Sequence, residues 1–210
     1  MPVDAAWYFD PLSPYVYLQL PDLERLPPEV RLRPVPVLLA ALLKHWGTKG
    51  PAELPSKRLH TYRQCVWLAR SRGLPFRMPP RHPFNPLGAL RLLCALGPSL
   101  EQARIASRFV FQDGGDPSTE EGLRELGRRL QVEKVEALAA APSAKDRLRA
   151  NTDEAIAHRV WGVPTLRFGE ELFWGADSFP MVLDYLADPD FFATPEMNRL
   201  ATLPIGAARA

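Results

Sequence analysis

The chain has 210 residues, of which 46% are hydrophobic and 24% are charged, and its formal net charge is +2. This composition is typical of a globular protein whose core needs no disulfide or metal for stability. No stretch reaches the roughly 18 to 20 apolar residues of a membrane span, and residues 1–6 lack the basic start and apolar run of a signal peptide. We therefore expect a cytoplasmic protein that does not enter a membrane.

The chain has two cysteines, Cys65 and Cys94, and each lies within an apolar helical pattern. Their separation matches neither a dithiol motif nor a metal site, so buried free thiols are predicted. The four histidines are scattered without the spacing of metal ligands. We predict no metal site.

The first element is a strand over residues 3–9, rich in aromatic residues and closed by a turn at Asp10-Pro11. Ser13 and Pro14 then open a helix, because serine can cap free amides and proline at the first position has no amide to lose. Pro21 is predicted to end or kink this helix. A helix N-terminus favours an anion or thiolate, although on spacing alone Ser13 is more simply a cap.

The middle of the chain is helical. Residues 30–37 alternate apolar and basic residues before two prolines, which predicts an edge strand. A short buried helix is expected over 38–46. From residue 40 to residue 150 the patterns are helical without a strand signal, and a proline-rich stretch at 75–86 is predicted to be an ordered loop.

Strand patterns return near the end of the chain. Residues 164–168 and 171–174 flank a Gly-Glu turn and predict a hairpin, after which Asp177 is expected to cap a last helix. This order predicts an α/β fold with a discontinuous domain over 1–39 and 151–190. Residues 40–150 then form a helical insertion domain, and 191–210 form a loop-like tail.

Residues 57–108 contain ten lysines and arginines and one acid, Glu101. The basic residues are spread through helical and proline-rich sequence, without a nucleic-acid recognition motif. We therefore expect no nucleic-acid partner and favour an anionic small molecule or a solvated face balanced by acids elsewhere.

Three motifs, Phe-Asp-Pro-Leu-Ser-Pro-Tyr at 9–15, Trp-Gly-Val-Pro-Thr at 161–165 and Phe-Trp-Gly-Ala-Asp at 173–177, carry a resemblance over essentially the whole chain. Together they resemble kappa-class glutathione transferases and 2-hydroxychromene-2-carboxylate isomerases, within the superfamily of disulfide oxidoreductases. The resemblance implies a thioredoxin-like fold interrupted by a large all-helical insertion domain. It also implies a homodimer.

The resemblance assigns the chemistry to Ser13. This residue stands where redox relatives carry the first cysteine of a Cys-x-x-Cys pair, and Val16 stands in place of the second. Dithiol exchange is therefore excluded for these positions. A serine hydroxyl can instead hydrogen-bond the sulfur of bound glutathione and keep it as the nucleophilic thiolate.

Four further residues are implied to bind glutathione. Val163 and Pro164 resemble the cis-proline turn that pairs with its cysteinyl part, and Asp177 matches a contact to its γ-glutamyl end. Lys57 matches a lysine near a carboxylate of glutathione or of the substrate, although it is also one of many basic residues in its segment.

The chain departs from the isomerase pattern at Thr48, His60 and Gln64, where an asparagine, an aromatic residue and an acid are expected. These departures concern the substrate more than the fold. The leading expectation is a glutathione-dependent isomerase of the 2-hydroxychromene-2-carboxylate type, acting on a small anionic aromatic-derived substrate in aromatic catabolism. The alternatives are a kappa-like glutathione transferase and a non-catalytic thioredoxin-fold binding protein.

Overall fold

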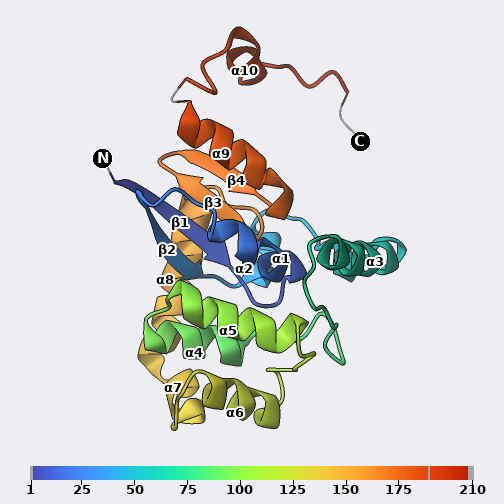
Figure 1. Ribbon diagram of the computed structural model, residues 1–210, viewed down its shortest axis with the longest axis vertical. Coiled ribbons are helices and arrows are strands. Elements are labelled where there is room, and N and C mark those ends of the chain that lie inside the picture. The colour runs from blue at the N-terminus through green and yellow to red at the C-terminus, as the bar shows by residue number, and fades with distance from the viewer. Residues whose placement is uncertain (1, 189, 208–210) are drawn as a thin grey trace.

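The computed structural model describes residues 2–188 and 190–207, and its centre is a four-stranded sheet (Figure 1). The strands are β1 (Val3–Phe9), β2 (Val30–Pro36), β3 (Thr165–Phe168) and β4 (Glu171–Trp174). Their order is β2-β1-β3-β4, with β2 parallel to β1 and the other pairs antiparallel. The predicted strands and hairpin are confirmed.

The sheet places its most apolar strand at the centre. Trp7, Tyr8 and Phe9 of β1 are completely buried, because β1 has a neighbour on each side and helices cover the sheet. Pro34 and Pro36 lie on β2, the edge strand, where an amide missing from the outer side costs no ladder hydrogen bond. Helix α1 (Pro14–Leu23) connects the parallel pair.

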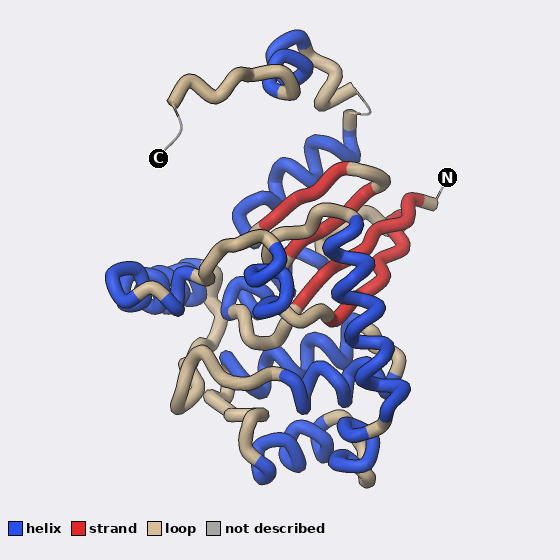
Figure 2. The backbone as a smooth tube through the Cα atoms, turned by 180° about the vertical axis from the view of Figure 1, so that it is seen from behind, coloured by secondary structure: helices blue, strands red, loops and turns tan. Residues whose placement is uncertain are grey.

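Within the described residues, the chain between β2 and β3 consists of helices and loops and contains no strand. Its helices are α2 (Leu39–His45), α3 (Pro55–Ser71), α4 (Leu87–Leu96), α5 (Leu100–Phe111), α6 (Glu120–Arg129), α7 (Val135–Ala140) and α8 (Pro142–Ala157). Helices α4 to α7 form a block at one end of the sheet, α3 projects to one side, and α8 returns along the back of the sheet (Figures 1 and 2). This is a thioredoxin-like fold with a helical insertion.

Three local predictions were wrong. Helix α1 continues through Pro21 to Leu23, because the buried side chains of Leu20 and Leu23 anchor its last turn. Helix α2 is largely uncovered, and among its residues only Leu42 is fully buried. The tail contains a helix, α10 (Pro195–Leu200), whose N-terminus is capped by the Thr194 side chain.

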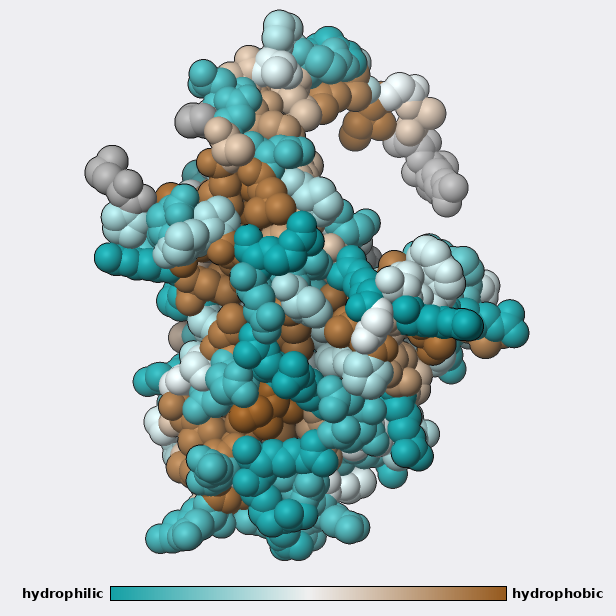
Figure 3. Space-filling view, in the orientation of Figure 1, coloured by the Kyte–Doolittle hydropathy of each residue, from teal (hydrophilic) through white to brown (hydrophobic). Residues whose placement is uncertain are grey.

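Three arginines of the basic segment form ion pairs with described residues of the fold. Arg72 pairs with Asp22 at 2.9 Å, and Arg104 pairs with Glu24 at 2.7 Å. Arg81 lies 2.9 Å from the buried carboxylate of Asp116. Figure 3 shows hydrophilic residues beside paler and hydrophobic ones at α3, and Leu59, Val66 and Trp67 of this helix are exposed.

Cys65 and Cys94 are buried free thiols, as predicted. Among the described residues, no group of His, Cys, Asp and Glu side chains is arranged to hold a metal ion. None of the helices in the described ranges is long and apolar enough to cross a bilayer.

Candidate functional site

The turn after β1 is held by a buried carboxylate. Asp10 is fully buried, and its two oxygens accept the amides of Leu12, at 2.9 Å, and Leu39, at 3.0 Å. One side chain therefore ties the end of β1 to the start of α2. Burial raises the pKa of Asp10 from 3.8 to about 7, although both hydrogen bonds oppose the shift.

Ser13 occupies the N-cap position of α1 in extended backbone, but its side chain makes no capping hydrogen bond. The cap role expected from spacing is therefore wrong for the hydroxyl. Instead, Oγ lies 3.4 Å from the backbone oxygen of Val163, and only 6% of Ser13 is exposed. The structure thus brings together the first and second motifs, which are 150 residues apart.

The Val163–Pro164 peptide bond is cis, as the resemblance implies. Both residues are buried. A Cβ at Gly162 would lie 2.5 Å from Nε1 of Trp174, so this position needs glycine for the loop to approach the indole. The loop beside Ser13 is therefore packed rigidly against the hairpin.

Asp177 lies in a 3-10 turn, η2 (Ala176–Ser178), one residue before the N-cap of α9 (Phe179–Ala187). Its predicted capping role is wrong, because the N-cap of α9 is Ser178 and no side chain caps this end. Asp177 is exposed. It contributes to the raised pKa of Tyr15, which burial chiefly causes, so the carboxylate lies near that tyrosine at the start of α1.

Gln19 is a positioning residue that the sequence patterns did not reveal. It is completely buried, accepts from Nε1 of Trp7 at 2.8 Å and donates to the carbonyl of Gly175 at 3.1 Å. Ser178 donates to the same carbonyl at 2.8 Å, and Gly175 has a φ of +92° that favours glycine. These contacts orient the turn that carries Asp177.

Lys57 is exposed in the first turn of α3, and its side chain does not reach the cavity beside Ser13. Its carbonyl accepts from Thr61 Oγ1 at 3.0 Å, and Thr61, one turn further along the helix, does line the cavity. Gln64 takes a defined role, because it accepts from the Tyr15 hydroxyl at 3.0 Å. Thr48 and His60 are exposed.

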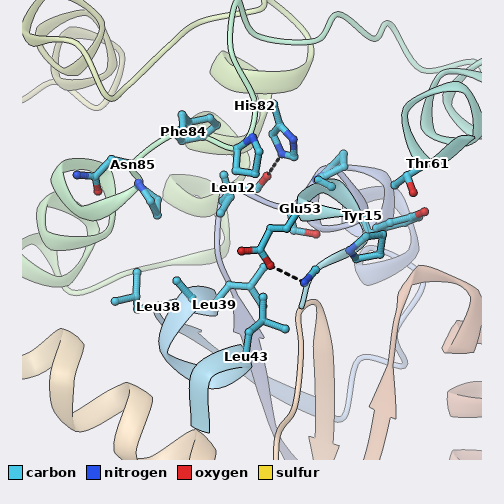
Figure 4. Close-up of a pocket in the computed structure, with 18 of the residues that line it drawn as sticks. Leu12, Tyr15, Leu38, Leu39, Leu43, Glu53, Thr61, His82, Phe84 and Asn85 are labelled. Carbon is cyan, nitrogen blue, oxygen red and sulfur yellow. Dashed lines mark hydrogen bonds between the residues drawn. The ribbon is translucent and has the colours of Figure 1, made fainter. Parts of the chain in front are cut away.

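A cavity of about 370 Å³ opens beside Ser13. Figure 4 shows its walls, with Leu39 and Leu43 of α2 on one side and His82 and Phe84 of the proline-rich loop on another. The 3-10 turn η1 (Pro51–Glu53) and the start of α3 complete the lining. Sequence patterns did not predict this cavity, because its walls come from five segments that only the fold brings together.

His82 links the proline-rich loop to the turn that holds Ser13. Its Nε2 lies 2.9 Å from the carbonyl oxygen of Leu12, and its Nδ1 lies 2.9 Å from the hydroxyl of Tyr62. A carbonyl can only accept, so Nε2 carries the proton. The Tyr62 hydroxyl lies within hydrogen-bond distance of both Nδ1 and the His82 carbonyl, at 2.9 and 2.8 Å, and its single proton serves one of the two. Burial lowers the pKa of His82 and keeps the ring neutral.

Replacing His82 with leucine should lower the free energy of unfolding by about 1 to 3 kcal/mol, because the buried carbonyl of Leu12 loses its donor. Urea denaturation of the purified variant measures this loss. Tyr62→Phe is the matched control: it removes the hydroxyl that lies near His82 Nδ1 and the His82 carbonyl, and it leaves the bond from Nε2 to Leu12, so its loss of stability should be smaller. Equal losses of unfolding free energy in the two variants would contradict the assignment of the His82 proton to Nε2, facing the Leu12 carbonyl.

The fold and the site define a class: a thioredoxin-like protein in which a serine precedes the first helix and faces a cis-proline loop. The DSBA-like thioredoxin domain matches residues 6–187. The chain therefore belongs to that family.

The chain is 26% identical over 205 residues to a protein named glutathione S-transferase kappa 2 from Caenorhabditis elegans, covering 87% of this chain and 91% of that protein. It is 25% identical over 184 residues to a 2-hydroxychromene-2-carboxylate isomerase of Pseudomonas putida, covering 84% and 90%. A solved structure of a 2-hydroxychromene-2-carboxylate isomerase superposes with a TM-score of 0.75 at 23% identity, covering 88% and 94%. The last similarity concerns the fold alone.

Proposed function

We propose that this protein is a glutathione-dependent enzyme in which Ser13 holds the bound thiol as a thiolate. The observation that carries the proposal is the state of the Ser13 hydroxyl, which is placed at the N-terminus of α1 and makes no capping bond. The same residue lines a cavity of about 370 Å³ that can take a second substrate. The similarity to kappa transferases and to isomerases supports the same class.

The chain's own thiols do not supply the nucleophile. Cys65 and Cys94 are buried, and burial raises the pKa of Cys65 to about 11. A thiol with such a pKa is protonated at neutral pH and is a poor nucleophile. Glutathione therefore supplies the thiolate that attacks the electrophile.

The residues around Ser13 fit glutathione. The Ser13 hydroxyl can donate to the sulfur, and the positive end of the α1 dipole stabilises the thiolate. Backbone groups of Val163, before the cis-proline, are offered to the cysteinyl part. The exposed carboxylate of Asp177 suits the γ-glutamyl ammonium, and Lys57 suits a carboxylate at the outer end.

Two reactions fit this arrangement. In an isomerase reaction of the 2-hydroxychromene-2-carboxylate type, glutathione is regenerated at the end of each turnover. In a transferase reaction, glutathione remains bonded to the released product. Assaying free thiol after turnover separates the two, because only a transferase consumes thiol in proportion to product. A small aromatic-derived electrophile is the proposed second substrate in either case.

Glutathione binding should be visible as a rise in melting temperature. A ligand present at about 100 times its Kd stabilises the folded state by about 2.7 kcal/mol. We expect reduced glutathione to raise the melting temperature, and S-methylglutathione to raise it less because it lacks the thiol that Ser13 holds.

Asp177→Asn is the matched variant for this titration, because it keeps the size of the side chain and removes the proposed charge partner of the ammonium. It should weaken the shift with both ligands. Absence of a shift with either ligand on the wild-type protein would favour the rival proposal, a non-catalytic thioredoxin-fold binding protein.

A further inference from the structure

The cavity beside Ser13 contains one charged side chain. Its ionisable lining residues are Tyr15, Glu53 and His82, and among the described residues no lysine or arginine lines it. Burial raises the pKa of Tyr15 and lowers that of His82, so both groups are neutral at pH 7. Among the described residues, Glu53 is therefore the one charged side chain in the cavity lining, and it is exposed to solvent. The charges of Arg58 and Asp177 act on the lining residues His82 and Tyr15 from outside the lining.

Glu53 is fixed at the wall by its own loop. Its Oε2 accepts the amide of Gly50 at 2.6 Å, and its own amide donates to the Gly50 carbonyl at 3.0 Å. Leu43 lies beside the same glycine. Figure 4 shows the carboxylate between α2 and Tyr15. One hydrogen bond, from the Gly50 amide, thus holds the side chain, and a second, between backbone groups, closes the turn that carries it.

No described basic side chain pairs with Glu53 within 4.0 Å. Arg58 is tied to the carbonyl of Ala52 at 2.6 Å and does not line the cavity. Lys57, the proposed partner of a glutathione carboxylate, also lies outside the lining. The negative charge therefore faces both the cavity and solvent, and no described basic side chain is paired with it.

A carboxylate entering this cavity would lose water against Leu12, Leu39 and Phe84 and would meet the Glu53 charge. A buried anion without a paired cation is strongly disfavoured, and a like charge disfavours it further. Glutathione escapes this penalty, because Val163, Pro164 and Asp177, its proposed contacts, do not line the cavity. Ser13 stands at the boundary between the two regions.

We propose that the second substrate is an uncharged, largely apolar electrophile, and that Glu53 is the residue that discriminates against carboxylate-bearing ones. The inference rests on the proposed glutathione chemistry and narrows it, since it favours a transferase over an isomerase of a chromene carboxylate. The proposal differs from the expectation of a small anionic substrate, and the experiment below decides between the two.

The test compares methyl 4-chloro-3-nitrobenzoate with its free acid. With glutathione each would form a carbon–sulfur bond as chloride leaves with the carbon–chlorine electron pair, and the thiol proton goes to solvent. Wild-type protein should turn over the ester with a kcat/KM at least about tenfold above that for the acid, after division by the uncatalysed rates. Binding of each compound alone, followed by thermal shift, should show the same preference without any chemistry.

Glu53→Gln keeps an oxygen that accepts from the Gly50 amide and removes the negative charge. The variant should therefore have a several-fold smaller ratio of kcat/KM for the ester to kcat/KM for the acid. Glu29→Gln changes an exposed carboxylate before β2 that does not line the cavity, so its ratio should equal that of the wild type. A wild-type ratio near one, or an unchanged ratio in Glu53→Gln, would overturn the inference.

The binding arm needs no glutathione, so it tests the inference even if glutathione does not bind. Loss of the glutathione shift with a retained ester preference would overturn only the proposed function. A glutathione shift with equal binding of ester and acid would overturn only the role of Glu53.

Discussion

Replacing Ser13 with alanine should lower glutathione-dependent turnover by about 100-fold or more, which is the usual cost of removing one donor to a developing or bound anion. The hydroxyl is the side-chain donor that the fold places at the start of α1, facing Val163. Without it the bound thiol should be less acidic. The pH dependence of thiolate absorbance in the complex measures this directly, and it should move to higher pH in the variant.

The fold should tolerate this change, because Ser13 makes no capping bond and its one side-chain contact is long, at 3.4 Å. Ser99→Ala is the matched control. Ser99 does cap its helix, accepting the amide of Gln102, so its loss should cost about 1 kcal/mol of stability and leave turnover unchanged. Wild-type turnover in Ser13→Ala would instead support the non-catalytic binding protein.

The protein should lose stability as pH rises from about 4 to about 7, and Asp10 should be the cause. In the unfolded chain this carboxyl ionises near 3.8, whereas in the folded chain it holds its proton up to about pH 7. Between these values the folded state binds more protons, so stability falls with rising pH. At 1.36 kcal/mol per pKa unit the loss is on the order of 4 kcal/mol.

Asp10→Asn removes the ionisable carboxyl at this position. Urea denaturation of the wild type and the variant between about pH 4 and about pH 8 measures how much that carboxyl contributes to the pH dependence of the free energy of unfolding. The variant also loses one acceptor, because its amide group cannot accept from both Leu12 and Leu39, so at about pH 4 it should be less stable than the wild type. The informative quantity is the difference between the two curves, in which other groups such as His82 cancel. Parallel curves would show that Asp10 is ionised in the folded protein.

Much of the fold follows from local sequence. The apolar run at 3–9, the Ser-Pro helix start and the hairpin at 164–174 were predicted because strand alternation, turn residues and proline at a helix start act within a few residues. The errors lie where packing overrides such signals. Pro21 remains helical because Leu20 and Leu23 are buried around it, and α2 is exposed because it borders a cavity.

The candidate site was only partly predictable. Ser13, Val163, Pro164 and Asp177 were identified from motifs, and the structure places Ser13 against Val163 and Asp177 near Tyr15. Lys57 was identified from the same resemblance and lies outside the cavity. The positions of residues along the chain do not specify which of them share a cavity.

The sequence by itself determined the helix start at Ser13 and the absence of a Cys-x-x-Cys pair, which excludes dithiol chemistry there, because both are properties of adjacent residues. Only the tertiary structure decided that the Ser13 hydroxyl is not used as a cap and faces Val163, and that Glu53 is the one charged side chain among the described residues that line an apolar cavity. The reason is physical: burial and unpaired charge depend on which distant segments exclude water together. Five segments line this cavity, and their positions along the chain do not show that they meet.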